Sequence, residues 1–166
     1  ISLGGTILLT ACQDKSQTNE PLIDGLVCTS SPLDLLECSK YIERDRNKLY
    51  QQWLLKRLIK QTLLDPFSQE ENSFNLIKNK IKNMKINTIR EFDEVITAPR
   101  WGYKDSKDYY YSASPIFELR QGEKLKIPTL FLQSIDDPWV PYNSTEEIRN
   151  NLIKNKNLEV VITKKG

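Results

Sequence analysis

The order of apolar and polar residues along the chain predicts strands and helices that alternate. Residues 22–29 form an apolar, partly β-branched run, and residues 128–135 are apolar at nearly every position, which is typical of strands buried in a sheet. A third run, residues 158–163, also has the composition of a strand. Helical spacing of apolar residues fills much of the chain between these runs, so the pattern predicts an α/β fold with a mostly parallel sheet flanked by helices.

Residue spacing predicts four helices in the first half of the chain. Residues 5–12 are small or apolar and suit a helix packed closely on the sheet, and a helical pattern restarts at residues 33–39. Apolar residues recur every three or four positions across residues 41–64, with Lys and Arg between them, and a second basic helix follows at residues 73–85. These two basic helices differ in composition from the rest of the chain and indicate an insertion.

The second half of the chain contains a predicted loop and a predicted helix start. Residues 99–111 include five aromatic side chains and are expected to form a loop. The sequence Ser144-Thr145-Glu146-Glu147 has the spacing of a capping box, in which Ser144 and Glu147 satisfy first-turn N–H groups. We expect the helix that begins there to run to about residue 154.

Length and charge narrow the class of protein. The chain has 166 residues, 39% of them hydrophobic, which is enough for one domain. Its apolar runs fall short of the roughly 20 residues that a membrane-spanning helix needs, so we expect a soluble globular protein. We place it in the cytoplasm as a separate expectation. The net charge of +2 gives no case for a nucleic-acid partner, although the segment from Lys40 to Arg90 holds twelve basic and five acidic residues.

The chain contains no histidine, which removes the commonest general base and zinc ligand from what it can do alone. Its three cysteines, Cys12, Cys28 and Cys38, are odd in number and lack metal-binding spacing. We therefore expect reduced, mostly buried thiols, and the sequence predicts neither a metal ion nor a cofactor.

A serine near the start of the chain is the first candidate for chemistry. Ser2-Leu3-Gly4-Gly5 before a predicted helix matches the second half of the G-x-S-x-G nucleophile elbow, whose leading glycine would fall just before residue 1. In such an elbow the serine hydroxyl projects from a sharp turn, and the next backbone N–H faces the developing oxyanion. On the motif alone, a helix N-cap serine beside flexible glycines is the alternative.

A pair of acids follows the strand predicted at residues 128–135. Asp136 and Asp137 stand before Pro138, where an α/β hydrolase carries the acid that orients its catalytic histidine. On these residues alone, a polar turn in which one aspartate caps backbone N–H groups and Pro138 sets the geometry is the favoured interpretation.

A series of short motifs carries a family resemblance over nearly the whole chain. They are Ser2-Leu3-Gly4-Gly5, Ser30-Ser31-Pro32-Leu33-Asp34-Leu35, Arg90-Glu91-Phe92-Asp93, Thr97-Ala98-Pro99, Asp108-Tyr109-Tyr110, Ser112-Ala113-Ser114 and Asp136-Asp137-Pro138. In this order they resemble the YheT-like group of the α/β hydrolase superfamily. The resemblance implies that residues 1–166 are the C-terminal part of an α/β-hydrolase fold, with a helical cap inserted at about residues 40–95. It also implies a serine carboxylesterase that cleaves acyl or lipid esters.

Carried over residue by residue, the resemblance implies three site residues. Ser2 would be the nucleophile, the Leu3 backbone N–H one oxyanion donor, and Asp137 the acid that orients the histidine, with Asp136 as the fallback. The histidine and the second oxyanion donor would lie outside these residues. We therefore expect both ends to be truncations and the chain alone to be inactive.

The expected partner is a small-molecule acyl ester, without nucleic acid. The basic cap would face solvent or an anionic lipid surface. Two other functions stay open at this point: a non-catalytic or split hydrolase-like protein that acts through a partner chain, and a lipoprotein anchored at Cys12, because Leu9-Thr10-Ala11-Cys12 resembles a lipoprotein cleavage box.

Overall fold

A computed structural model describes residues 1–13, 23–65, 71–120, 125–151 and 156–166. The chain folds into two compact units. The first, here called the sheet unit, comprises residues 1–41 and 110–166, and the second, the helical unit, comprises residues 42–109. No helix in the described ranges has both the length and the apolar character needed to cross a membrane.

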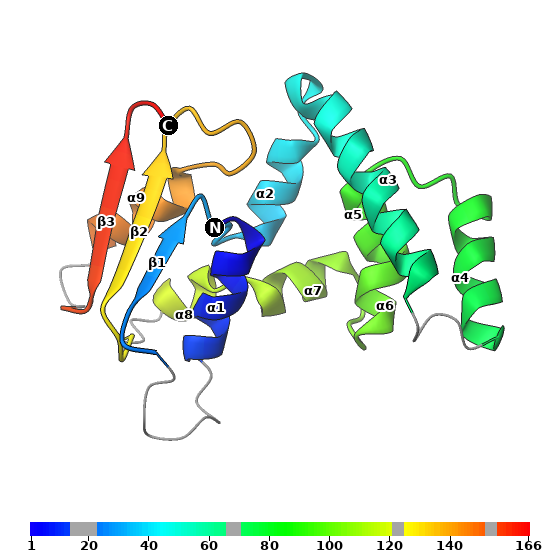
Figure 1. Ribbon diagram of the computed structural model, residues 1–166, viewed down its shortest axis with the longest axis horizontal. Helices are drawn as coiled ribbons and strands as arrows, with labels where there is room; N and C mark the ends of the chain where they lie inside the picture. The colour runs from blue at the N-terminus through cyan, green and yellow to red at the C-terminus, as the bar shows by residue number, and fades with distance from the viewer. Residues whose placement is uncertain (14–22, 66–70, 121–124, 152–155) are drawn as a thin grey trace. The chain divides into compact units, whose positions relative to one another are not determined.

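The sheet unit contains a parallel sheet in which β1 (Leu26–Thr29), β2 (Thr129–Ser134) and β3 (Leu158–Thr163) lie in that order. All three predicted strands are confirmed, and their arrowheads point to the same edge of the sheet (Figure 1). The first strand begins at Leu26, because the preceding Asp24 and Gly25 have poor strand propensity. Residue 22, where the predicted strand starts, lies outside the described residues.

One face of the sheet forms the main core of this unit. Alternate residues of the strands, such as Cys28 and Phe131, point to this face and lie opposite each other in the register. They are packed against helices α1 (Leu3–Gln13), α8 (Ile116–Arg120) and α9 (Asn143–Asn151). The helices contribute the buried apolar residues Leu9, Ile116 and Ile148.

Helix α1 confirms the first predicted helix, whereas α2 (Leu35–Ile42) begins two residues after the predicted start. The delay has a local cause, because the Asp34 carboxylate accepts a hydrogen bond from the Glu37 backbone N–H at 2.9 Å and so acts as the N-cap.

Two predictions for the second half of the chain are wrong. Helix α9 begins at Asn143, so Ser144 lies inside it and donates its hydroxyl to Glu37 Oε2 at 2.8 Å instead of capping the helix. The predicted loop at residues 99–111 contains a short helix, α6 (Ala98–Arg100), and the start of α7 (Ser106–Ala113). Helix α7 begins there because Asp105 Oδ1 accepts a hydrogen bond from the Asp108 N–H.

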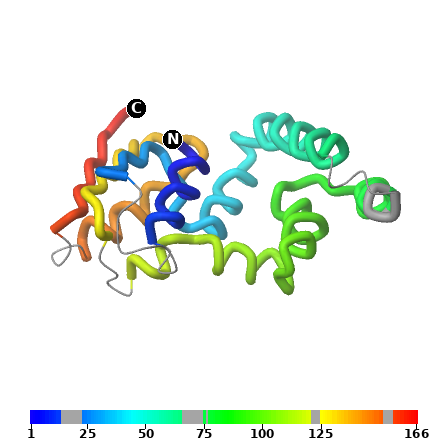
Figure 2. The backbone as a smooth tube through the Cα atoms, turned by 60° about the horizontal axis from the view of Figure 1, so that its bottom comes forward, coloured from blue at the N-terminus to red at the C-terminus, as the bar shows by residue number. Residues whose placement is uncertain are grey.

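The helical unit contains α3 (Lys48–Leu64), α4 (Glu71–Asn83) and α5 (Ile89–Phe92), which continues into η3 (Asp93–Thr97) and α6 (Figure 2). Its small core joins α3 to the α5–η3 segment through the buried residues Leu55, Phe92 and Ile96. The helix predicted at residues 41–64 is interrupted by the turn η1 (Asp45–Asn47), so α3 begins only at Lys48.

Candidate active site

Ser2 occupies the turn that leads into α1. Its backbone has a φ of 52°, in the left-handed region that non-glycine residues seldom adopt. The turn is held at both sides, because the Ser2 N–H donates to Thr29 O at 3.0 Å and the Ser2 carbonyl accepts from the Gly5 N–H at 2.9 Å. The exposed hydroxyl-bearing residue therefore sits on a constrained backbone next to the end of β1.

Gly5 lets α1 approach the turn after β1 very closely. A Cβ atom at Gly5 would stand 2.1 Å from Ser31 Oγ and 3.1 Å from Ser31 Cβ, whereas one at Gly4 would meet nothing within 4 Å. The approach is fixed further along the helix, where Thr6 Oγ1 donates to Pro32 O at 2.7 Å. The close approach therefore falls at Gly5, whereas Gly4, the glycine of the G-x-S-x-G motif, meets no neighbour.

The Leu3 backbone N–H lies at the first position of α1. The first amides of a helix have no partner within the helix, and the helix dipole places partial positive charge there. The Leu3 N–H is therefore suited to stabilise negative charge that develops beside Ser2.

Asp137 lies in the loop after β2, and its carboxylate is held by backbone groups. Asp137 Oδ1 accepts hydrogen bonds from the N–H groups of Trp139 and Val140, both at 2.9 Å, and Oδ2 lies 3.4 Å from Gln133 Nε2. The side chain is half-buried. These contacts fix the orientation of the carboxylate.

Asp136 has different neighbours. Its Oδ1 accepts hydrogen bonds from the Ser134 hydroxyl and from the Gly166 N–H, the latter at 3.1 Å. The Ser134 bond in particular, with the Gly166 bond in addition, lowers the pKa of this exposed carboxyl. The two acids that the sequence leaves as alternatives are therefore engaged by different parts of the turn.

Ser2 and Asp137 both lie at the carboxyl ends of neighbouring parallel strands, Ser2 beside the end of β1 and Asp137 in the loop that follows β2. The Ser2 N–H is bonded to Thr29, the last residue of β1, and the Asp137 N–H donates at 3.4 Å to Ser134 O, the last residue of β2. Carboxyl ends of parallel strands share one edge of a sheet, which is where open α/β proteins bind ligands (Figure 1).

Gln133 is a supporting residue that the sequence reasoning missed. It is only 2% exposed, and its Nε2 donates to Ser134 O at 3.2 Å and to Val140 O at 3.1 Å. Together with its Asp137 contact, these bonds tie the acid-bearing loop to the sheet. The available signal was an amide side chain inside an otherwise apolar strand.

The cysteines do not add a second chemistry to this edge. Burial, reinforced by the nearby Asp137 carboxylate, raises the pKa of Cys38 to about 12, and its thiol donates to Trp139 O at 3.6 Å. Cys12 lies in the last turn of α1 and is packed against the sheet core, which argues against its being a lipidated residue on a tether. Among the described residues, no group of three His, Cys, Asp or Glu side chains could hold a metal ion.

Comparison with known proteins gives related sequences over most of the chain. The chain is 33% identical over 141 residues to an Escherichia coli (strain K12) protein named "Putative esterase YheT", a match that covers 85% of this chain and 39% of that protein. It is 30% identical over 168 residues to the protein "Phospholipase ABHD3" of Homo sapiens, covering 100% of this chain and 38% of that protein. The chain thus spans well under half the length of these relatives. No family model matches it.

A solved structure supports the fold. An acylaminoacyl peptidase in complex with a chloromethyl ketone matches all of this chain and 18% of its own, with a TM-score of 0.51 and 18% identity. At this identity the likeness concerns the fold alone.

Proposed function

The chain belongs to the YheT-like group of α/β hydrolases, and on this basis we propose that the protein containing it hydrolyses carboxylic esters by acyl transfer through Ser2. The observation that carries the proposal is the turn at Ser2, which has a φ of 52°, is hydrogen-bonded to the end of β1 and leads into α1 at Gly4 and Gly5. The name of the human phospholipase relative supports a lipid ester as substrate. We propose that its acyl chain is of medium or greater length.

In the proposed mechanism, Ser2 Oγ attacks the ester carbonyl carbon while a histidine from outside these residues takes the hydroxyl proton. The carbonyl electron pair moves to the oxygen, where the Leu3 N–H donates a hydrogen bond. Collapse expels the alcohol, which takes the proton from the histidine, and water then repeats the sequence to release the acid. Asp137 orients the histidine through the carboxylate that its own loop holds in place.

Other parts of the proposal concern the helical unit and the chain by itself. We place the inserted cap in the helical unit, residues 42–109, which overlaps the segment of about 40–95 given by the sequence. Since the chain contains no histidine, the 166 residues alone should show no ester turnover.

A fluorophosphonate probe on the whole protein tests the nucleophile. Ser2→Ala should abolish labelling, whereas Ser30→Ala should retain it. Ser30 is a matched control, because it is also a serine with a positive φ, 47°, next to the end of β1. Labelling that survives Ser2→Ala would refute the assignment, and a wild-type protein without labelling or turnover would favour the non-catalytic alternative.

Two conservative variants distinguish the acids. Asp137→Asn should lower kcat by roughly 10⁴-fold if that carboxylate orients the histidine. Asp136→Asn should have a much smaller effect, and the opposite ranking would move the role to Asp136.

A further inference from the structure

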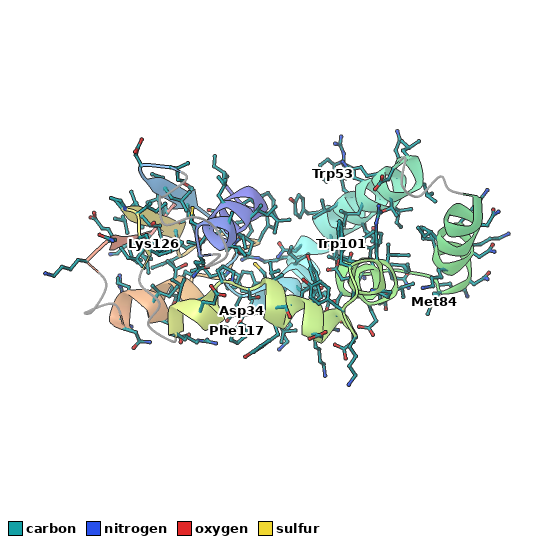
Figure 3. The ribbon with its side chains drawn as sticks, turned by 90° about the horizontal axis from the view of Figure 1, so that it is seen from below. Asp34, Trp53, Met84, Trp101, Phe117 and Lys126 are labelled. Carbon is teal, nitrogen blue, oxygen red and sulfur yellow. The ribbon has the colours of Figure 1, made fainter. Side chains whose placement is uncertain are left out.

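Helix α3 presents apolar side chains on the side that faces away from the core of the helical unit. Leu55 is packed in that core, but Leu49, Trp53 and Leu64 are 83%, 51% and 60% exposed. Positions 49, 53, 60 and 64 follow one another at spacings that keep them on one side of a helix. Figure 3 shows Trp53 on α3. Large apolar groups gathered on one exposed helix face mark an interaction surface.

The charged residues on the same face are all positive. Lys56 and Lys60 lie on it, and none of the 17 residues of α3 is acidic. The Arg57 guanidinium lies 4.6 Å from the centre of the Trp53 ring. We call the set Leu49, Trp53, Lys56, Lys60 and Leu64 the outer face of α3.

Two of the carboxylates close in sequence to this helix are engaged elsewhere within the helical unit. Glu43 pairs with Arg90 at 3.3 Å, and Asp65 pairs with Arg100 at 2.6 Å. Since α3 itself contains no acidic residue, Lys56 and Lys60 have no acid on their own helix to neutralise them, and the positive charge of the outer face favours an anionic partner.

We propose that the outer face of α3 binds an anionic lipid surface. Exposed Leu and Trp side chains enter the boundary between headgroups and acyl chains, and lysine ammonium groups bind the anionic headgroups while their methylene stems lie along the apolar surface. A nucleic acid would attract the same lysines but offers no apolar layer to Leu49 and Leu64. The inference deepens the proposed function by supplying the surface at which a lipid ester is met, and it rests on that function for its biological sense.

Vesicle binding of the whole protein tests the proposal without any turnover. Vesicles of phosphatidylcholine with phosphatidylglycerol should bind the protein more tightly than vesicles of phosphatidylcholine alone, and added salt should weaken the difference. Replacing both lysines in Lys56→Gln/Lys60→Gln should weaken binding to the anionic vesicles roughly 25-fold, from about fivefold for each positive charge. Trp53→Ala should weaken binding to both vesicle types.

Matched controls use the same chemical changes elsewhere. Lys107→Gln/Lys126→Gln removes two exposed positive charges outside α3, and Trp101→Ala removes an exposed tryptophan from the same unit. Both control variants should bind the anionic vesicles with an affinity within about twofold of that of the wild type, because neither changes the outer face of α3. Circular dichroism should show that each variant is folded.

The proposal would be overturned if the protein failed to bind anionic vesicles, or if binding were unchanged in the Lys56→Gln/Lys60→Gln variant. It would also be overturned if the control variants weakened binding as much as the α3 variants do. Binding of a single-stranded RNA that is tighter than vesicle binding and depends on the same lysines would favour a nucleic acid instead and overturn the proposal as well. The outcome is independent of catalysis. Vesicle binding that persists while the Ser2 labelling test fails would retain the surface and reject the hydrolase.

Discussion

Replacing Gly5 by alanine should disturb the contact that brings α1 against the turn after β1. The new methyl carbon would stand 2.1 Å from Ser31 Oγ and 3.1 Å from Ser31 Cβ. Rotation of the Ser31 hydroxyl relieves the first contact but leaves the second, so the helix itself must move. Both Gly5 and Ser31 are buried, which leaves little room for that movement.

The expected magnitude follows from comparison with the neighbouring glycine. An added methyl group in a packed site costs about 1–3 kcal/mol. A glycine-to-alanine change within a helix also stabilises by about 0.5–1 kcal/mol, and this gain applies to Gly4 and Gly5 alike. Since an alanine at Gly4 meets nothing within 4 Å, the difference between the two variants isolates the steric cost.

Thermal unfolding followed by circular dichroism measures this difference. At about 2 kcal/mol, Gly5→Ala should unfold roughly 4–8 °C below Gly4→Ala, given about 2–4 °C per kcal/mol at this size. Adding Ser31→Ala to Gly5→Ala should recover only the part of the loss that comes from turning the Ser31 hydroxyl away from Thr29 O, because the 3.1 Å contact with the Cβ of residue 31 remains. Equal unfolding temperatures for the two glycine variants would refute the close-approach argument.

Three further predictions concern the sheet unit. Gln133→Leu should lower the free energy of unfolding by about 1–3 kcal/mol in urea titration, since it leaves the buried Val140 carbonyl without its donor, and an unchanged midpoint would contradict this. Arg120 lowers the pKa of Glu147, so the stability that this pair contributes is present above the ordinary glutamate pKa and is lost as pH falls through the lower folded value. Arg120→Gln should therefore cost less than about 1 kcal/mol near neutral pH and nothing at low pH, as measured by unfolding across that range. Cys38, with its pKa of about 12, should resist alkylation by iodoacetamide until the protein unfolds, and rapid native-state labelling seen by mass spectrometry would show that it is accessible.

Local patterns predicted the elements whose formation depends on nearby residues. The three strands follow from apolar runs, and α1 follows from small and apolar residues at helical spacing. The exact start of α2 depended on a local cap at Asp34, which the sequence contains but the apolar pattern does not reveal.

Predictions failed where distant residues compete for the same side chains. Ser144 and Glu147 have the spacing of a capping box, yet Ser144 is bonded to Glu37 and Glu147 to Arg120. A capping box does form at Thr88, whose hydroxyl accepts from the Glu91 N–H at 3.1 Å. The same motif thus succeeds or fails according to which partners the fold supplies.

The sequence by itself determined the α/β order of elements, the family resemblance and the candidates Ser2, Leu3 and Asp137, because these depend on residue type, spacing and order along the chain. Only the tertiary structure decided that Ser2 has a positive φ, that Gly5 rather than Gly4 forms the close approach, and that Asp137 and Asp136 have different hydrogen-bond partners. These properties arise from contacts between segments far apart in the chain, whose geometry no local pattern encodes.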